Sequence, residues 1–174
     1  MTNQYKMRLF IGISPTDEVR NALVKMQNFL QRSGITGSFL TPDNLHMTLA
    51  YIGEYPEIGP VMDAMEEVSF SAFPITYTRI GTFRESIVWG GIEPSEPLNV
   101  LVKGLRYHLA MADIPFDNSA FSPHFTLVRH ADFSKGIPPV DIDPVTMTVD
   151  RITLYRSDRG KDGMIYTEIG YVLC

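Results

Sequence analysis

The tetrapeptide His46-Met47-Thr48-Leu49 returns later in the chain as His124-Phe125-Thr126-Leu127, and the fold prediction starts from this pair. Both lie in stretches whose apolar pattern predicts a β-strand, over residues 45–52 and 121–128. Successive side chains of a strand point to opposite faces, so the His and the Thr of each tetrapeptide share one face. The apolar residues between them face the other way, into a core.

The segments that precede the two tetrapeptides also match. Phe10 and Trp89 each lie in a predicted strand at almost the same distance before the motif histidine, and one capped helix lies in each interval. Two strand-helix-strand units with matching ends suggest a duplication. We therefore predict a single domain over residues 1–174, with half-repeats at approximately 5–84 and 85–174. A pseudo-twofold axis between the halves would bring both motif strands to one central cleft.

The rest of the chain predicts an α+β fold. Helices are expected after Ser14-Pro15, after Pro56-Glu57 and after Ser95-Glu96-Pro97, since apolar residues follow at helical spacing. Further strands are predicted over residues 7–13, 73–83, 87–92, 145–155 and 164–172. Residues 159–163 have the composition of a hairpin tip between the last two strands.

Composition excludes several classes of protein. The chain is 44% hydrophobic and 20% charged, which is typical of a globular domain rather than a disordered chain or a coiled coil. No apolar run approaches the ~20 residues of a membrane-spanning helix, and no secretory signal is recognised. The net charge of −5 argues against binding of duplex DNA through many phosphate contacts. Binding of a small phosphate ligand or of an RNA end is compatible with this charge. The lone Cys174 indicates a cytoplasmic protein without disulfides, and we expect a monomer.

Two imidazoles and two hydroxyls on one cleft suit the opening of a cyclic phosphodiester. Water attacks phosphorus in line with the leaving oxygen, so one group must take a proton from the water and another must give one to the departing alkoxide. An imidazole has an unperturbed pKa of ~6.5, so one can be neutral and the other charged near neutral pH. The threonine hydroxyls can donate to the non-bridging oxygens, where negative charge develops. This chemistry requires no metal ion.

Each of the four histidines could also have a purely structural role. A single copy of the motif would more often be structural than catalytic, whereas two copies at matched positions favour function. His108 is expected to be structural on the third helix, and His130 to be exposed. His124, His130 and Asp132 could be drawn as a zinc site, but the two histidines are too far apart along a strand for clustered ligands. We therefore predict neither a metal nor a cofactor.

Two blocks of sequence, residues 42–54 and 121–129, resemble the 2H phosphoesterase superfamily and, within it, the RNA 2′,3′-cyclic phosphodiesterases of bacteria and archaea, historically called 2′-5′ RNA ligases. Weaker similarity in residues 8–13, 81–89 and 154–157 extends the resemblance over nearly the whole chain. The resemblance implies a bilobal α+β fold with two pseudo-symmetric lobes. Each lobe would be an antiparallel sheet with outer helices, and the active cleft would lie between the lobes.

The resemblance also implies roles for five residues. His46 would be the general acid and His124 the general base, while Thr48 and Thr126 would hold the phosphate. Arg129 matches an arginine that often follows the second motif and contacts phosphate. By strict alternation Arg129 points away from the face of His124, so only a bulge or the end of the strand would bring it to the cleft. The alternative is a salt bridge on the outer face.

Three functions follow from this site. The leading prediction is metal-independent hydrolysis of 2′,3′-cyclic phosphates on RNA ends or nucleotides to 2′-phosphates. A second hypothesis keeps the site but changes the substrate to 2′-5′ linkages or another cyclic phosphate, or adds reversible 2′-5′ ligation. A third is a nucleotide-binding module without turnover, although binding alone has little use for an opposed acid and base. Phe39, Phe83 and Trp89 are candidates to stack on a base.

Overall fold

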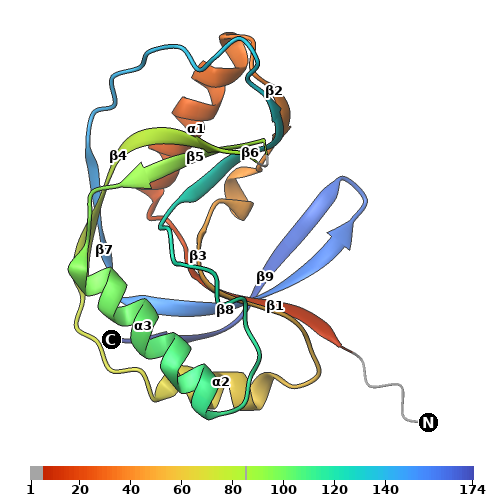
Figure 1. Cartoon of the computed structure of the whole chain (residues 1–174), viewed down its shortest axis with the longest axis vertical. Coiled ribbons are helices and arrows are strands. Elements are labelled where there is room, and N and C mark those ends of the chain that lie inside the picture. The colour runs from red at the N-terminus through yellow and green to blue at the C-terminus, as the bar shows by residue number, and fades with distance from the viewer. Residues whose placement is uncertain (1–5, 85) are drawn as a thin grey trace.

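Two antiparallel sheets, one above the other in Figure 1, form the computed structural model, which describes residues 6–84 and 86–174. The lower sheet has the strand order β3 (Met47–Tyr55), β1 (Met7–Ile13), β8 (Arg151–Gly160), β9 (Gly163–Leu173). The upper sheet has the order β2 (Thr36–Phe39), β6 (Phe125–Asp132), β5 (Ile87–Ile92), β4 (Phe73–Phe83), β7 (Val145–Val149). Every neighbouring pair is antiparallel. The predicted α+β class is confirmed.

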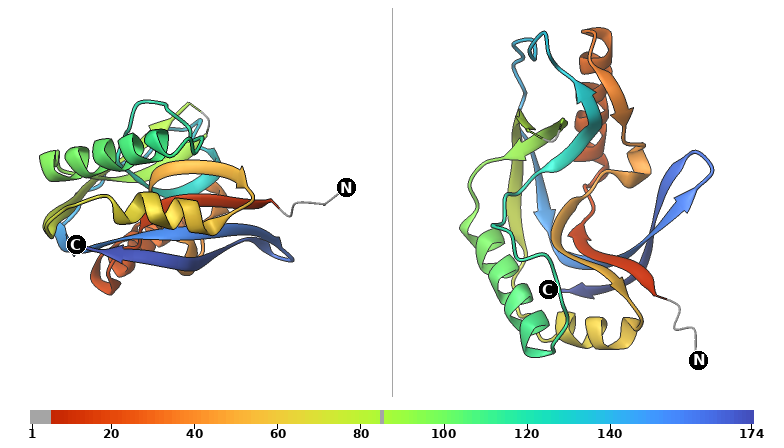
Figure 2. Two further views of the ribbon diagram at one scale, coloured as in Figure 1. Left: turned by 90° about the horizontal axis from the view of Figure 1, so that it is seen from below. Right: turned by 45° about the vertical axis from the view of Figure 1, so that its right-hand side comes forward.

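Three helices cover the outer faces of the sheets. Helix α1 (Asp17–Arg32) packs against the upper sheet, whereas α2 (Ile58–Glu66) and α3 (Glu96–Met111) pack against each other and the lower sheet (Figures 1 and 2). A short 3-10 helix, η1 (Pro42–Asn44), leads into β3. The predicted bilobal arrangement is therefore present. No helix of the described residues is long and apolar enough to cross a membrane.

The two sheets correspond strand by strand. The order β3-β1-β8-β9 matches the order β6-β5-β4-β7, with β2 as an additional edge strand. Both motif strands, β3 and β6, thus hold equivalent places. Each sheet nevertheless takes strands from both predicted half-repeats. Helix α1 packs on the sheet opposite to the preceding strand β1, and α3 packs on the sheet opposite to its flanking strands β5 and β6. The half-repeats therefore do not coincide with the lobes, and residues 5 and 85 lie outside the described residues.

Burial of one face of each helix explains this packing. Helix α1 buries a stripe at helical spacing, and so does α3; the residues are Val19, Leu23, Met26, Leu30, Leu98, Leu101, Val102, Leu105 and Leu109. They join one continuous core with the inward side chains of both sheets. Each fully buried aliphatic side chain contributes about 2 kcal/mol relative to an exposed one, so this stripe fixes which sheet each helix covers.

Some element boundaries differ from the sequence prediction. The first helix is capped by Thr16, whose hydroxyl accepts from the Val19 N–H, and not by Ser14. The stretch predicted as one strand over 145–155 is two strands, β7 in the upper sheet and β8 in the lower, which separate at Asp150. Strand β2 was not predicted, because this short edge strand is largely exposed and has no buried residue.

Candidate active site

The two motif histidines are anchored to the backbone in the same way. His46 Nδ1 donates to the Asn44 carbonyl at 2.6 Å, and His124 Nδ1 donates to the Ser122 carbonyl at 2.8 Å. A carbonyl can only accept, so this contact places the proton on Nδ1 of the neutral ring. Nε2 of each ring is then the atom with a free lone pair. Each histidine immediately precedes its strand, β3 or β6, which fixes the direction of the ring.

A close approach of two backbones places His46 and the start of β3. Gly12 of β1 lies opposite Thr48, and a Cβ atom at Gly12 would come within 2.5 Å of the Met47 carbonyl oxygen. Only a residue without a side chain allows this contact. The glycine therefore lets the first motif strand lie tightly against β1.

His46 lies in an aromatic cage. Its ring is 4.7 Å from Phe10 and 5.0 Å from Tyr166 between centroids. Tyr155 stacks on Phe10 at 4.9 Å and lies 6.0 Å from the His46 ring. The Tyr155 hydroxyl is hydrogen bonded to Ser14. These contacts leave the residue only 8% exposed. The cage comes mainly from β1, β8 and β9, which are far from the motif in sequence.

His124 has a more open environment. Phe83 at the end of β4 meets its ring edge-to-face at 5.0 Å, and Trp89 lies 5.4 Å beyond Phe83. The Trp89 ring lies flat over Gly81, where any side chain would overlap it. Among the described residues no second aromatic ring stacks directly on His124, which remains half-buried. Of the three predicted stacking candidates, Phe83 and Trp89 lie beside His124, and Phe39 lines a cavity together with Arg129.

The two motif threonines also differ. Thr48 Oγ1 lies 3.0 Å from His46 Nε2 and donates to it when Nδ1 carries the ring proton. Thr126 is 7% exposed and pairs across the sheet with Trp89. Within the described residues no hydrogen bond joins Thr126 to His124. The hydroxyl of Thr126 is thus available to another acceptor, whereas that of Thr48 must leave Nε2 first.

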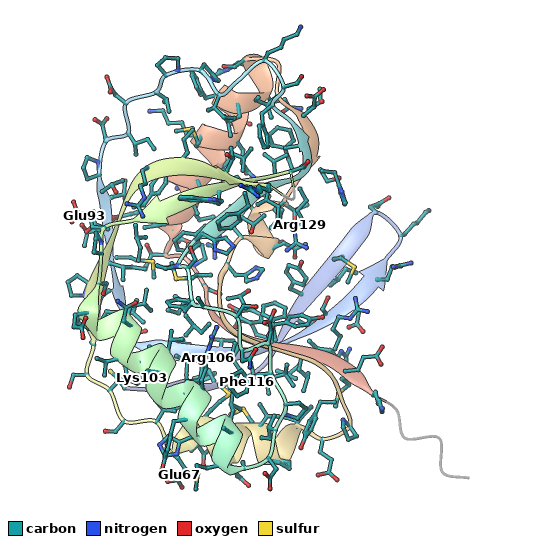
Figure 3. All side chains as sticks on the ribbon, viewed as in Figure 1. Glu67, Glu93, Lys103, Arg106, Phe116 and Arg129 are labelled. Carbon is teal, nitrogen blue, oxygen red and sulfur yellow. The ribbon has the colours of Figure 1, made fainter. Side chains whose placement is uncertain are left out.

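A β-bulge resolves the orientation of Arg129. Val88 pairs with Val128 while its neighbour Trp89 pairs with Thr126, so Leu127 is an extra residue in β6. The bulge is held by Gln27, whose side-chain N–H donates to the Leu127 carbonyl at 2.9 Å. One extra residue shifts the alternation, and Arg129 comes to the face of Thr126. Figure 3 shows Arg129, in the middle of β6, on the side toward the β8–β9 hairpin.

The electrostatic environment keeps both imidazoles neutral. Burial lowers the pKa of His46 to about 4; the Asn44 carbonyl opposes this shift, and the charges of Arg129 and His124 add to it. Burial also lowers the pKa of His124, opposed by the Ser122 carbonyl and reinforced by Arg129. The Arg129 charge acts on both rings, so the five predicted residues are brought together in one region.

Two cavities flank these residues. One of about 410 Å³ has Thr48, Phe83 and His124 in its wall, together with Arg106 and the loop 117–122. The other, of about 330 Å³, lies beyond Arg129 and is bounded by residues 38–41 and the β8–β9 hairpin. Both are within the usual range for a nucleotide-sized ligand. A cavity of about 470 Å³ between α1 and residues 140–145 contains none of the predicted site residues.

Arg106 of α3 braces the wall of the first cavity. Its Nε and Nη2 donate to the Leu49 carbonyl at 3.3 and 3.2 Å, and its Nη1 donates to the Ser119 carbonyl at 2.7 Å (Figure 3). The Asp117 N–H also donates to the Tyr51 carbonyl at 2.8 Å. The loop that leads to His124 is thereby fastened to the strand that carries Thr48.

Other sequence candidates lie apart. His108 is half-buried on α3 next to Tyr107, and His130 is exposed at the edge of the second cavity. In residues 6–84 and 86–174 no group of three His, Cys, Asp or Glu side chains is arranged to hold a metal ion. Sequence reasoning missed Tyr155, Tyr166 and Arg106. No local pattern marks them, because each meets the motifs only through long-range packing.

Comparisons with known proteins agree on one group. The family model described as "2'-5' RNA ligase superfamily" matches residues 16–161. The "RNA 2',3'-cyclic phosphodiesterase" of Thermus thermophilus is 31% identical, with 92% of this chain and 87% of that protein covered. The protein of the same name from Thermotoga maritima is 28% identical, with 92% and 91% covered. A crystal structure of Escherichia coli LigT complexed with 3′-AMP has a TM-score of 0.82 at 26% identity and covers 97% of each chain.

Proposed function

Because this chain belongs to the 2′-5′ RNA ligase superfamily, we propose that it hydrolyses 2′,3′-cyclic phosphates on RNA ends or nucleotides to 2′-phosphates. The observation that carries the proposal is the matched anchoring of the two imidazoles. Each has its Nδ1 on a backbone carbonyl, which leaves Nε2 unprotonated, and a threonine lies two residues along the chain. The names of the relatives and the 3′-AMP complex of LigT support an RNA or nucleotide substrate.

The reaction needs one group that takes a proton from the attacking water and another that gives a proton to the leaving oxygen. We assign His124 Nε2 as the base that removes a proton from water as the water oxygen attacks phosphorus. The bond from phosphorus to the 3′ oxygen breaks on the opposite side, and His46 Nε2–H protonates that oxygen. The product keeps its ester bond to the 2′ oxygen as a 2′-phosphate. Catalysis by two such groups typically contributes ~10²–10⁴-fold for each.

His46 must carry a proton to act as the acid, yet burial holds its pKa at about 4 in the free protein. An anionic phosphate close to the ring favours the charged form and raises this pKa. Substrate binding and protonation of His46 are therefore linked. Protonation of Nε2 also releases the Thr48 hydroxyl, which can then donate to a non-bridging oxygen together with Thr126 and Arg129.

We propose that two half-repeats, approximately 5–84 and 85–174, arose by duplication, because β1, β3 and β4 of the first half hold the same places in the two sheets as β5, β6 and β8 of the second. We also propose a cytoplasmic monomer that acts without a metal or cofactor and binds single-stranded ends rather than duplex DNA. The net charge of −5 supports the last point.

The product isomer tests the assignment of acid and base. Hydrolysis of 2′,3′-cyclic AMP should give predominantly the 2′-monophosphate, and phosphorus NMR distinguishes the two isomers. A predominantly 3′-phosphate product would mean that the substrate lies reversed, with the roles of His46 and His124 exchanged. No hydrolysis of cyclic mononucleotides or of RNA with cyclic ends would reject the proposed function.

A further inference from the structure

A notch with an excess of positive charge lies between the β8–β9 hairpin and the start of β1. The pairing of β1 with β8 ends at Arg8 and Ser157, while the hairpin continues to Gly160 and diverges from β1 (Figures 1 and 2). A cavity of about 510 Å³ fills this notch. Its charged lining residues are Lys6, Arg8, Arg156 and Arg159, with Glu54 and Asp158.

The positive charges of the notch are only partly compensated. Asp158 pairs with Arg156 at 2.8 Å. Among the described residues no carboxylate lies within ion-pair distance of Arg8 or Arg159, and both side chains are exposed. Glu54 lies opposite Arg8 on the neighbouring strand β3, and its negative charge offsets part of the Arg8 charge. Such cations stay solvated unless an anion binds.

The notch lies on the same face of the lower sheet as the candidate active site. Arg8 precedes Phe10 by two residues on β1, so the two side chains share a face, about 7 Å apart along the strand. Phe10 contacts the His46 ring. Tyr166, which pairs with Ser157 across the hairpin, contacts the same ring. Arg8 is therefore beside the aromatic cage of His46, and it lies further from the His46 ring than Phe10 does.

The notch also adjoins the second cavity of the site. Met164 at the hairpin lines both the notch and the cavity that contains Arg129. Arginines thus lie at both ends of a path that runs from Arg129, beside the two imidazoles, past Asp162 and Met164 of the hairpin to Arg8 and Arg159. The path therefore extends over two adjoining cavities, of about 330 and 510 Å³.

We propose that this path binds the phosphodiester backbone of an RNA strand whose cyclic end lies at His46 and His124. The proposal rests on the proposed function and specifies its substrate: an oligonucleotide, contacted at backbone phosphates by Arg8 and Arg159, rather than a free cyclic mononucleotide. Guanidinium groups suit phosphate oxygens, because their planar fork donates two parallel hydrogen bonds. The contacts read no base and therefore impose no sequence preference.

The test compares two substrates and two double variants. The substrates are 2′,3′-cyclic AMP and a short single-stranded RNA that ends in a 2′,3′-cyclic phosphate. The variant is Arg8→Gln/Arg159→Gln, and the matched control is Arg32→Gln/Arg151→Gln, which removes the same charge from exposed positions elsewhere. Loss of two phosphate contacts should lower kcat/KM for the RNA about 10-fold near 0.1 M salt, and it should leave cyclic AMP and the control unchanged.

Salt dependence gives a second readout. The slope of log kcat/KM against log salt for the RNA should become shallower by about 1.4 in the variant, since each phosphate contact to a single strand contributes about 0.7. Equal losses on both substrates, an equal loss in the control, or no loss would each overturn the proposal.

A binding measurement separates this proposal from the proposed function. Fluorescence anisotropy of a labelled RNA with a terminal 2′-phosphate should show about 10-fold weaker binding to the variant than to the wild type or the control. If wild-type protein hydrolyses neither substrate, the proposed function fails. The binding result then still decides whether the path holds RNA.

Discussion

His46 and His124 share one backbone geometry, since each Nδ1 donates to the carbonyl two residues earlier. Their surroundings differ. The His46 ring is enclosed by Phe10 and Tyr166 and bonded to Thr48, whereas His124 has Phe83 at its edge and lines a cavity. Burial accordingly lowers the pKa of His46 to about 4. The local motif thus sets the tautomer and direction of a ring, while the long-range packing around it sets its proton affinity.

The largest expected effect comes from removing either ring. His46→Ala and His124→Ala should each lower kcat ~10²–10⁴-fold, because each deletes one of the two proton-transfer groups. Steady-state hydrolysis of 2′,3′-cyclic AMP measures the loss. His108→Ala, on the outer helix α3, is the control and should retain its kcat. Near-wild-type turnover in either motif variant would show that the replaced histidine is not one of the two proton-transfer groups.

A smaller loss should follow removal of a motif hydroxyl. Thr48→Val and Thr126→Val keep the side-chain shape and should each lower kcat about 10²-fold, as loss of one oxyanion donor does. The two variants should differ in pH dependence. Only Thr48 is bonded to a motif imidazole, so Thr48→Val should shift the lower limb of the kcat/KM profile and Thr126→Val should not. Identical shifts of the lower limb in both variants would contradict a specific effect of the Thr48 hydroxyl on His46.

The pH profile itself sharpens the contrast. Since burial lowers the pKa of both His46 and His124, the bell-shaped profile of kcat/KM should have its maximum below pH 6.5, between the two macroscopic values of the coupled pair. Tyr166→Ala opens the cage to water and should move the lower limb, near pH 4, upward. Tyr171→Ala, an exposed position on the same strand, is the matched control. A maximum at pH 7 or above would contradict the burial of His46.

The smallest expected effect is that of chelation. In the proposed mechanism one imidazole takes a proton and the other gives one, so neither is free to serve as a metal ligand. Activity should therefore survive prolonged treatment with EDTA, measured by the same hydrolysis assay. If EDTA abolished hydrolysis and zinc or manganese restored it, the two rings would be metal ligands. The assignment of His46 as acid and His124 as base would then be wrong.

Much of this arrangement follows from local sequence. Strand and helix periodicity predicted the segments 73–83 and 87–92 with the bounds that the structure has, and the α+β class with two lobes was confirmed. The repeated tetrapeptide also predicted that the two motif strands hold equivalent positions. Such features depend on residues that are neighbours along the chain, so their pattern is visible in the sequence.

Other features depend on contacts that no local pattern carries. The bulge at Leu127, which turns Arg129 to the face of Thr126, is held by Gln27 from a distant helix. The break at Asp150 separates two strands that look continuous, because each continues in a different sheet. Tyr166 reaches His46 only through the β8–β9 hairpin. The proton affinity of the site could not be predicted for the same reason.

The exchange of strands and helices between the lobes has a consequence for how the molecule assembles. Strand β1 is an interior strand of the lower sheet, and its partner β8 begins at Arg151, late in the chain. Neither lobe corresponds to a continuous piece of polypeptide, so neither can be excised or fold while the other is missing. Such distant pairings raise the contact order and slow folding. During synthesis on the ribosome, the β1 edge that faces β8 stays open until the last strands emerge, and that is when a nascent chain is most exposed to aggregation.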